Sequence, residues 1–250
     1  MAKKGSVHFD LLELFKGETC PVCRLASRHV ARYLDTISYE AVNDIQTRDK
    51  LRAALGFCPT HAWHWLNLHN ALGTAIIYKD VLTELIRRLD SLSPPKVGGF
   101  FAARGRKNEP DIGLSPSGPC PACEVRDESF ERSLDTFTSL LGDSEFVEGY
   151  QKSRAGLCLS HLRAVLSHSH EPQFSRLVAI EKARLEFTVG QLDELIRKYD
   201  YRFREEAVGD EAGAPTRAVK RLAGMEKLLA PATPLAKADW AQRISRGCVL

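Results

Sequence analysis

The feature that most constrains this chain is a pair of cysteines followed at a fixed distance by a cysteine and a histidine, and the feature occurs twice. The first copy is Cys20-Pro21-Val22-Cys23 with Cys58-Pro59-Thr60-His61, and the second is Cys120-Pro121-Ala122-Cys123 with Cys158-Leu159-Ser160-His161. In both copies 34 residues separate the second cysteine from the third, and the copies lie 100 residues apart. Together they use six of the seven cysteines.

This spacing is typical of metal ligands. Two ligands three residues apart on the first turn of a helix face the same side and can hold one ion, and four such ligands complete a tetrahedral shell. A shell without an open position is typical of structural zinc. We therefore predict two Cys3His zinc sites, two ions per chain, each built within its own half of the sequence. The expected ligands are Cys20, Cys23, Cys58 and His61 in the first half and Cys120, Cys123, Cys158 and His161 in the second.

Three other interpretations fit part of the pattern. An iron–sulfur cluster is the runner-up, because three cysteines and one histidine are chemically reasonable ligands for it. A disulfide framework leaves both histidines unexplained and needs an oxidising compartment. A thioredoxin-type redox pair needs a strand–helix–strand context, which the sequence does not predict.

Helical periodicity runs through both halves, and no segment has the pattern of a strand. We predict an all-α protein made of two repeated helical halves, each with a metal site, followed by a short helical tail. Identical residues recur at the 100-residue offset outside the ligands as well, for example Arg32, Leu34 and Asp35. The expected division is residues 1–92 for the first repeat, 93–119 for a linker rich in proline, glycine and serine, 120–206 for the second repeat, and 207–250 for a basic tail.

A long helix is expected to close each half, with apolar residues spaced alternately three and four apart, as in a helix–helix seam. The first seam contains Ala75, Tyr78, Leu82, Leu85, Leu89 and Leu92, and the second contains Leu185, Val189, Leu192, Ile196, Tyr199 and Phe203. We expect these helices to pack on each other or on shorter ones. Other helices are predicted over 8–17, 23–42 and 47–55, from Cys58 onward, and in short pieces near 215–229 and 235–245.

Composition narrows the classes of partner and compartment. Hydrophobic residues make up 44% and charged residues 27%, as in a globular protein. We expect no secretory signal and no membrane segment, because no window approaches the ~20 uncharged apolar residues that a span needs. The predicted location is the cytoplasm, where thiols stay reduced. The tail carries all of the net charge of +3, which is a weak signal for nucleic acid.

Residues outside the repeated pattern are assigned to ordinary structural roles. Trp63 and Trp65 are expected in the core, and Cys248 is expected to be an exposed thiol. The six remaining histidines have no counterpart in the other half, so we interpret them as core or surface residues. The sequence contains no P-loop, no nucleophile elbow, no dinucleotide fingerprint and no His-Glu-x-x-His motif.

The chain resembles an uncharacterised bacterial family, a domain of unknown function. The resemblance rests on Cys-Pro-x-Cys and Gly-[Phe/Leu]-Cys-x-x-His in both halves and on Asp200-Tyr201-Arg202-Phe203-Arg204, and it covers roughly residues 18–230. It implies a bacterial cytosolic setting and no known reaction.

The sequence thus favours a non-enzymatic interaction or regulatory protein stabilised by zinc, with another protein as its partner. Two alternatives stay open: a regulator that binds nucleic acid through its linker and basic tail, and a redox or metal sensor that loses its ion on oxidation. The oligomeric state is left open.

Overall fold

The computed structural model describes residues 5–92, 113–203 and 205–225, and everything regular within these ranges is helical. The first part of the chain contains α1 (Ser6–Leu14), α2 (Pro21–Thr36), the π-helical segment η1 (Ile37–Ala41), α3 (Ile45–Ala53), α4 (Pro59–Leu66) and α5 (Ala71–Asp90). The second contains α6 (Pro121–Leu140), α7 (Ser144–Lys152), α8 (Leu159–Ser167), α9 (Gln173–Lys198), the 3₁₀ helix η2 (Asp210–Gly213) and α10 (Ala214–Ala223). The predicted all-α class is confirmed.

Cysteines mark the starts of four helices. Cys20, Cys58 and Cys120 each occupy the position before a proline that begins a helix, at α2, α4 and α6. Proline suits this first position because its ring fixes a helical φ and its missing N–H would have no partner there. Cys158 precedes α8 in the same way, although leucine follows it.

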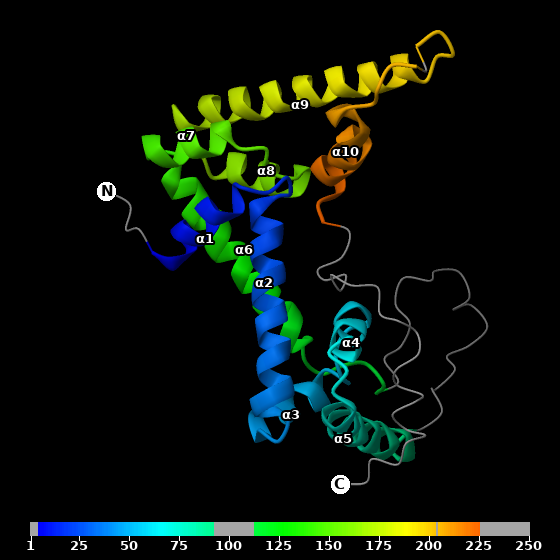
Figure 1. Ribbon diagram of the computed structural model, residues 1–250. Helices are drawn as coiled ribbons and strands as arrows, with labels where there is room; N and C mark the ends of the chain where they lie inside the picture. The colour runs from blue at the N-terminus through cyan, green and yellow to red at the C-terminus, as the bar shows by residue number, and fades with distance from the viewer. Residues whose placement is uncertain (1–4, 93–112, 204, 226–250) are drawn as a thin grey trace, which may run out of the picture.

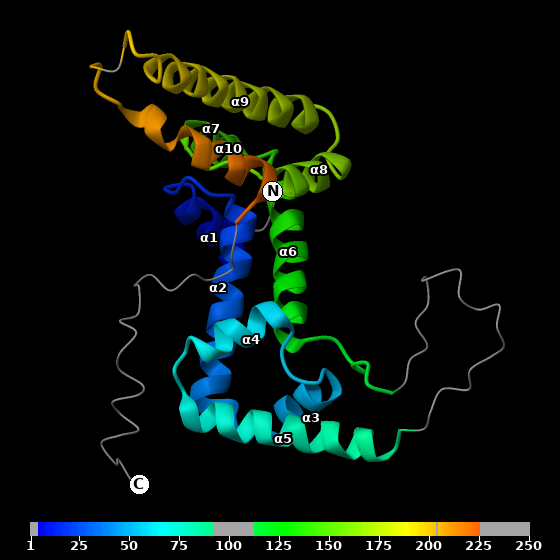
Figure 2. The ribbon, with the colours of Figure 1, turned by 90° about the vertical axis from the view of Figure 1, so that its right-hand side faces the viewer.

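Two helices form the centre of the molecule. α2 and α6 run antiparallel along each other and share the most extensive contact of any pair of described elements (Figures 1 and 2). Midway along this contact, His29 Nδ1 lies 2.7 Å from Ser129 Oγ. The two positions are 100 residues apart, which is the offset of the repeated motif.

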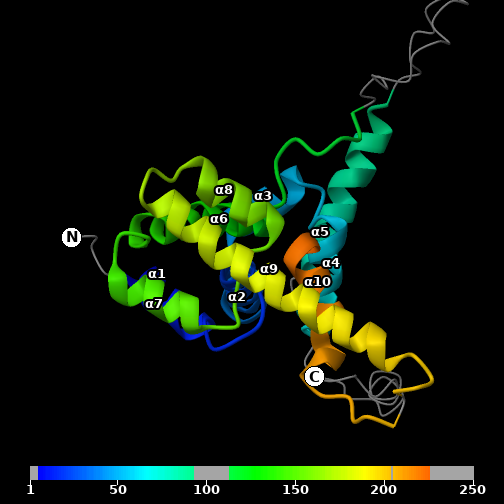
Figure 3. The ribbon, with the colours of Figure 1, turned by 90° about the horizontal axis from the view of Figure 1, so that it is seen from above.

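The remaining helices gather at the two ends of this central pair. α1, α7, α8, α9 and α10 lie at one end, and α3, α4 and α5 lie at the other (Figures 1 and 2). Seen along the central pair, α9 extends across the whole of its end (Figure 3).

Each end has its own hydrophobic core, and both cores mix the two parts of the sequence. One core combines the start of α2 with the far end of α6, α7 and α9, through residues such as Val22, Phe137 and Tyr150. The other combines the later part of α2 with α3, α4 and α5 and includes Ala122 from the start of α6. In each core, the start of one central helix therefore packs against helices from the other part of the sequence.

The predicted domain boundaries stay a prediction, since residues 93–112 and most of the tail lie outside the described ranges. The end of the predicted linker is attached to the first part of the chain, because the N–H groups of Ser117 and Gly118 donate to the carbonyl of Ala53 at 2.8 and 3.2 Å. α10 overlaps the predicted 215–229 piece, whereas the predicted piece at 235–245 and Cys248 lie outside the described residues.

The predicted seam on α5 is wrong in its details. The buried side chains of α5 are Ile77 and Val81, which pack with Gly73 one turn earlier, while Leu82 and Leu89 are about half exposed. α5 lies against the short helix α3, which covers only a narrow side of it, and α9 lies against α10 and η2. The two long helices are at opposite ends, so of the two expected arrangements only packing on shorter helices is found.

None of the described helices is both long and apolar enough to cross a lipid bilayer.

Candidate metal centres

The structure corrects the expected grouping of the ligands. All eight predicted residues fall into two Cys3His sets, but each set crosses between the halves of the sequence. One set is Cys20, Cys23, Cys158 and His161, and the other is Cys58, His61, Cys120 and Cys123. The repeated halves therefore do not each hold a site of their own.

Helix length explains the crossing. α2 has 16 residues, so it carries the chain about 24 Å away from Cys20 and Cys23. The next helix, α3, has 9 residues and can return only about 14 Å, so Cys58 begins α4 near the far end of α2. The start of α6 lies there, because α6 runs antiparallel to α2.

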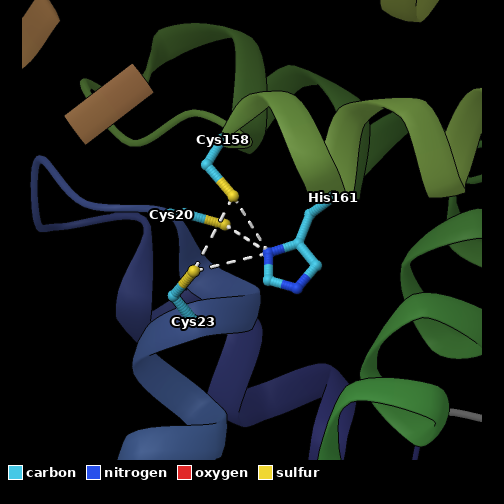
Figure 4. Close-up of side chains that lie close together, drawn as sticks. All are labelled: Cys20, Cys23, Cys158 and His161. Carbon is cyan, nitrogen blue, oxygen red and sulfur yellow. Dashed lines mark hydrogen bonds between the residues drawn. The ribbon is translucent and has the colours of Figure 1, made fainter. Parts of the chain in front are cut away.

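The first centre, which we call site 1, joins the start of α2 to the start of α8 (Figure 4). Nδ1 of His161 points at the three sulfurs and lies 3.4 Å from the sulfurs of Cys20 and Cys23 and 3.2 Å from that of Cys158. The sulfurs of Cys23 and Cys158 are 3.8 Å apart.

The second centre, site 2, joins the start of α4 to the start of α6 with the same geometry. Nδ1 of His61 lies 3.3 Å from the sulfur of Cys58, 3.6 Å from that of Cys120 and 3.5 Å from that of Cys123. The sulfurs of Cys58 and Cys123 are 3.6 Å apart. In each set all four ligand atoms lie within 4.8 Å of one another.

These separations fit a single tetrahedral ion. A zinc ion with bonds of about 2.3 Å to sulfur and about 2.0 Å to nitrogen holds two sulfurs about 3.8 Å apart and sulfur and nitrogen about 3.5 Å apart. The six described cysteines are all free thiols rather than disulfides. Each pair of helix starts also directs unpaired N–H groups at the sulfurs, which favours the thiolate form.

The two centres differ in how well protein covers them. All four ligands of site 1 are buried, and the chain after α10 passes over them, so that a β-carbon at Gly224 would lie 3.4 Å from the sulfur of Cys23. In site 2 only His61 is fully buried, and its three cysteines are partly exposed. No sequence pattern marks Gly224 as part of site 1, since its role depends on where α10 packs.

The thiols of the two sets differ in pKa, and hydrogen bonds from Cys20 and Cys23 lower the pKa of Cys158 well below its usual value. Burial and the neighbouring sulfurs raise the pKa of Cys20 well above its usual value, and burial with the nearby Cys120 and Cys58 raises the pKa of Cys123 to about 12. The histidines differ: burial and the nearby His64 lower the pKa of His61 to about 4. Burial acts to lower the pKa of His161 too, but hydrogen bonds with Cys158 and Cys23 outweigh it and raise that pKa to about 9.

The other predicted residues take structural positions. Trp65 is buried and its Nε1 donates to Thr74 Oγ1 at 2.9 Å, whereas Trp63 is 67% exposed, so the prediction of a core pair is half wrong. Residues two apart on a helix face different sides, so one core cannot cover both. His8 and His64 are buried, as expected of core histidines.

Comparison with known proteins places the chain in a family. A family model described as a family of unknown function (DUF6062) matches residues 7–228, and the chain belongs to this family. It is also similar to an "Uncharacterized 23.9 kDa protein in xynA 3'region" from Caldicellulosiruptor sp. (strain Rt8B.4), with 29% identity over 224 residues that cover 86% of this chain and 100% of that protein. No solved structure matches.

Proposed function

We propose that this protein binds two zinc ions at structural Cys3His sites and acts without catalysis, as an interaction or regulatory protein. The observation that carries the proposal is that each of the two sets offers four protein ligands at the spacing of one tetrahedral ion. Such an ion has no position left for a substrate or an activated water.

Ligand spacing supports zinc over an iron–sulfur cluster. In a cluster each iron atom has its own protein ligands, so the ligands spread around a core of several atoms. Here the three sulfurs of each set contact the same histidine nitrogen, at 3.2 to 3.4 Å in site 1 and 3.3 to 3.6 Å in site 2. One ion at the centre of each set satisfies all four ligands.

Metal content tests the identity and number of the ions. Protein purified without added metal is expected to contain about two zinc per chain by elemental analysis. A brown protein with stoichiometric iron would overturn the zinc assignment, and a metal-free, fully folded protein would overturn the structural role.

Cobalt substitution tests whether the shells are closed. Co²⁺ in a tetrahedral site rich in thiolates absorbs visible light, and its spectrum changes when an outside ligand enters the shell. We expect the spectrum of the cobalt protein to be unchanged by azide, because all four positions belong to the protein. A spectral shift with azide would show an open position and would favour a catalytic centre.

Exposed apolar side chains support the interaction role. Leu82 and Ile86 on α5 and Ile196 on α9 are each more than half exposed, and both long helices carry further examples. Leu82, Ile86 and Leu89 recur at the four- and three-residue spacing of one helix face, and an apolar helix face left exposed is typical of surfaces that contact partners. The proposed partner is another protein.

A redox or metal sensor is the second candidate, and the partial exposure of the site 2 cysteines favours it. It predicts that mild peroxide releases zinc, from site 2 before site 1. Unchanged zinc content and helicity after peroxide would count against this function.

Binding of nucleic acid has less support. Among the tail residues that the structure describes, Arg217 and Arg221 face carboxylates of the protein itself, and Arg243 and Arg246 lie outside the described ranges. The prediction of salt-sensitive binding that weakens when Arg243 and Arg246 are neutralised stays open to test at low salt.

A further inference from the structure

A pocket of about 610 Å³ lies between α9, α10 and the chain that follows α7, at the end of the molecule that carries site 1. Its volume falls within the range of about 300–1,000 Å³ typical of sites for small molecules. It contains none of the metal ligands, so it is separate from both centres.

Arginine dominates the charge of this pocket. Its lining includes Arg154, Arg176, Arg184, Arg217 and Arg221 and contains no acidic residue. Three carboxylates behind the lining face these arginines: Glu18 and Asp210 beside Arg154, and Glu181 beside Arg184. Five positive charges against three negative ones leave an excess of two.

Two buried arginine nitrogens make no hydrogen bond. They are Nε of Arg184 and Nη1 of Arg221, and the latter has only an ion-pair contact of 4.0 Å with Oε2 of Glu181. Both side chains are only 11% exposed. The guanidinium of Arg176 makes no ion pair with any described residue. Arg221 packs directly on Gly156, where a β-carbon would collide with it, so the lack of a side chain at Gly156 leaves room for this arginine.

Gln151, Ser153 and Thr188 are the other polar residues of the lining, and the remainder is apolar. Ala179, Ile180 and Ala183 line one side along α9, and the exposed ring of Phe187 lies on the next turn. An apolar wall beside a cluster of fixed positive charges suits a molecule with an anionic group and an organic part.

We propose that this pocket binds a small organic molecule that carries a phosphate group. The guanidinium fork matches phosphate oxygens in pairs. A phosphate monoester carries a charge of about −1.5 to −2 at neutral pH, which balances the excess of two in the pocket. The apolar wall along α9 contacts the organic part.

Phenyl phosphate is the probe, because its phosphate group tests the arginine cluster and its ring tests the apolar wall. Inorganic phosphate and phenol test each part of the pocket separately. Calorimetric titration of the zinc-loaded, full-length protein at low salt is expected to give saturable binding of phenyl phosphate at one site per chain. Inorganic phosphate is expected to bind at least about tenfold more weakly, because it does not contact the apolar wall.

Two variants locate the binding. Arg176→Gln and Arg154→Gln alter side chains at the open side of the pocket and are each expected to weaken phenyl phosphate about tenfold or more, since each removes charged hydrogen-bond donors. Arg163→Gln on α8 is the matched control, because Arg163 is exposed and does not line the pocket. Circular dichroism and zinc content, expected to be unchanged in all three, show that the fold is intact.

Two outcomes would overturn the proposal. One is no saturable binding of phenyl phosphate at millimolar concentration. The other is binding that Arg163→Gln weakens as much as Arg176→Gln does, which would indicate attraction to surface charge rather than a site.

Discussion

At the scale of single residues, each candidate metal ligand connects parts of the chain that are far apart in sequence. Cys158 lies 135 residues from Cys23, yet their sulfurs are 3.8 Å apart and face the same nitrogen of His161. Loss of one such sulfur removes a bond between helices as well as a ligand.

Replacing Cys158 by alanine is therefore expected to lower the zinc content from two ions per chain to one. Because a structural zinc contributes on the order of 10 kcal/mol, we expect a loss of several kcal/mol in the free energy of unfolding and a lower melting temperature. Elemental analysis and thermal melting measure both effects. Cys248→Ser is the control and is expected to keep two ions, since Cys248 lies outside the repeated sequence pattern. Two ions in the Cys158→Ala protein would contradict the assignment.

Tyr150 is a buried polar residue whose contribution to stability can be tested separately. Its hydroxyl accepts a hydrogen bond from the N–H of Leu157 at 2.9 Å and donates one to the buried carboxylate of Glu181. Tyr150→Phe removes the hydroxyl and with it both hydrogen bonds. We expect it to lower the free energy of unfolding, measured with denaturant, by about 1–3 kcal/mol.

The matched change, Tyr39→Phe, alters a side chain that is 87% exposed and is expected to cost less than about 0.5 kcal/mol. Equal effects of the two changes would show that the Tyr150 hydroxyl has no special role.

At the scale of elements, the end of α10 covers site 1. Gly224 has a φ of +79°, which glycine adopts readily and other residues avoid, and a β-carbon added there would lie 3.4 Å from the sulfur of Cys23 and 3.5 Å from that of Cys158. α10 thus ends in a backbone turn that lies directly over the ligands.

Gly224→Ala is expected to strain this turn and to speed the loss of zinc from site 1 to a competing chelator, while the rate at site 2 stays the same. A chromogenic chelator follows the two phases of release. Gly190→Ala on α9 is the control, because a β-carbon there meets no atom within 4 Å, and it is expected to stabilise the helix by about 0.5–1 kcal/mol. An unchanged rate at site 1 in Gly224→Ala would show that the turn does not protect the ion.

The helix starts and the ligand residues are the elements that sequence reasoning predicts well. Proline after cysteine and cysteine or histidine three residues apart are local signals, so they identify the starts of α2, α4 and α6 and the eight residues that the structure gathers into two Cys3His sets. The grouping of the ligands is not local, because it depends on the antiparallel packing of α2 on α6. The buried side of α5 is not a local property either. α5 has apolar residues on several sides, and its packing against α3 determines which of them are buried.

At the scale of the whole molecule, the different cover of the two sites predicts different reactivity. The cysteines of site 2 are partly exposed, whereas those of site 1 are buried. During gradual removal of zinc we expect alkylation of Cys58, Cys120 and Cys123 before Cys20, Cys23 and Cys158, as read by mass spectrometry of peptides. Simultaneous labelling of both sets would show that the sites lose their ions together.

Zinc binding is also expected to depend on pH, with affinity falling as pH falls. The pKa of Cys123 in the metal-free protein is about 12, so its thiol is protonated at neutral pH and zinc must displace that proton. The pKa of His61 is about 4, so above that pH its imidazole is already neutral and releases no proton. Calorimetry in buffers of different ionisation enthalpy measures the protons released, and binding without proton release would contradict this scheme.

Because the ligand sets cross between the halves of the sequence, the two sets become complete at different times during synthesis of the chain. A ribosome delivers Cys20 and Cys23 first, but their partners arrive only with Cys158 and His161. The other set is complete once Cys123 has been made, 38 residues before His161, which at about 5–20 residues per second is a difference of about 2 to 8 seconds. The ion whose ligands begin the chain is therefore the last to be enclosed, and a chain that stops short of residue 158 is left with an unpartnered pair of cysteines near its start.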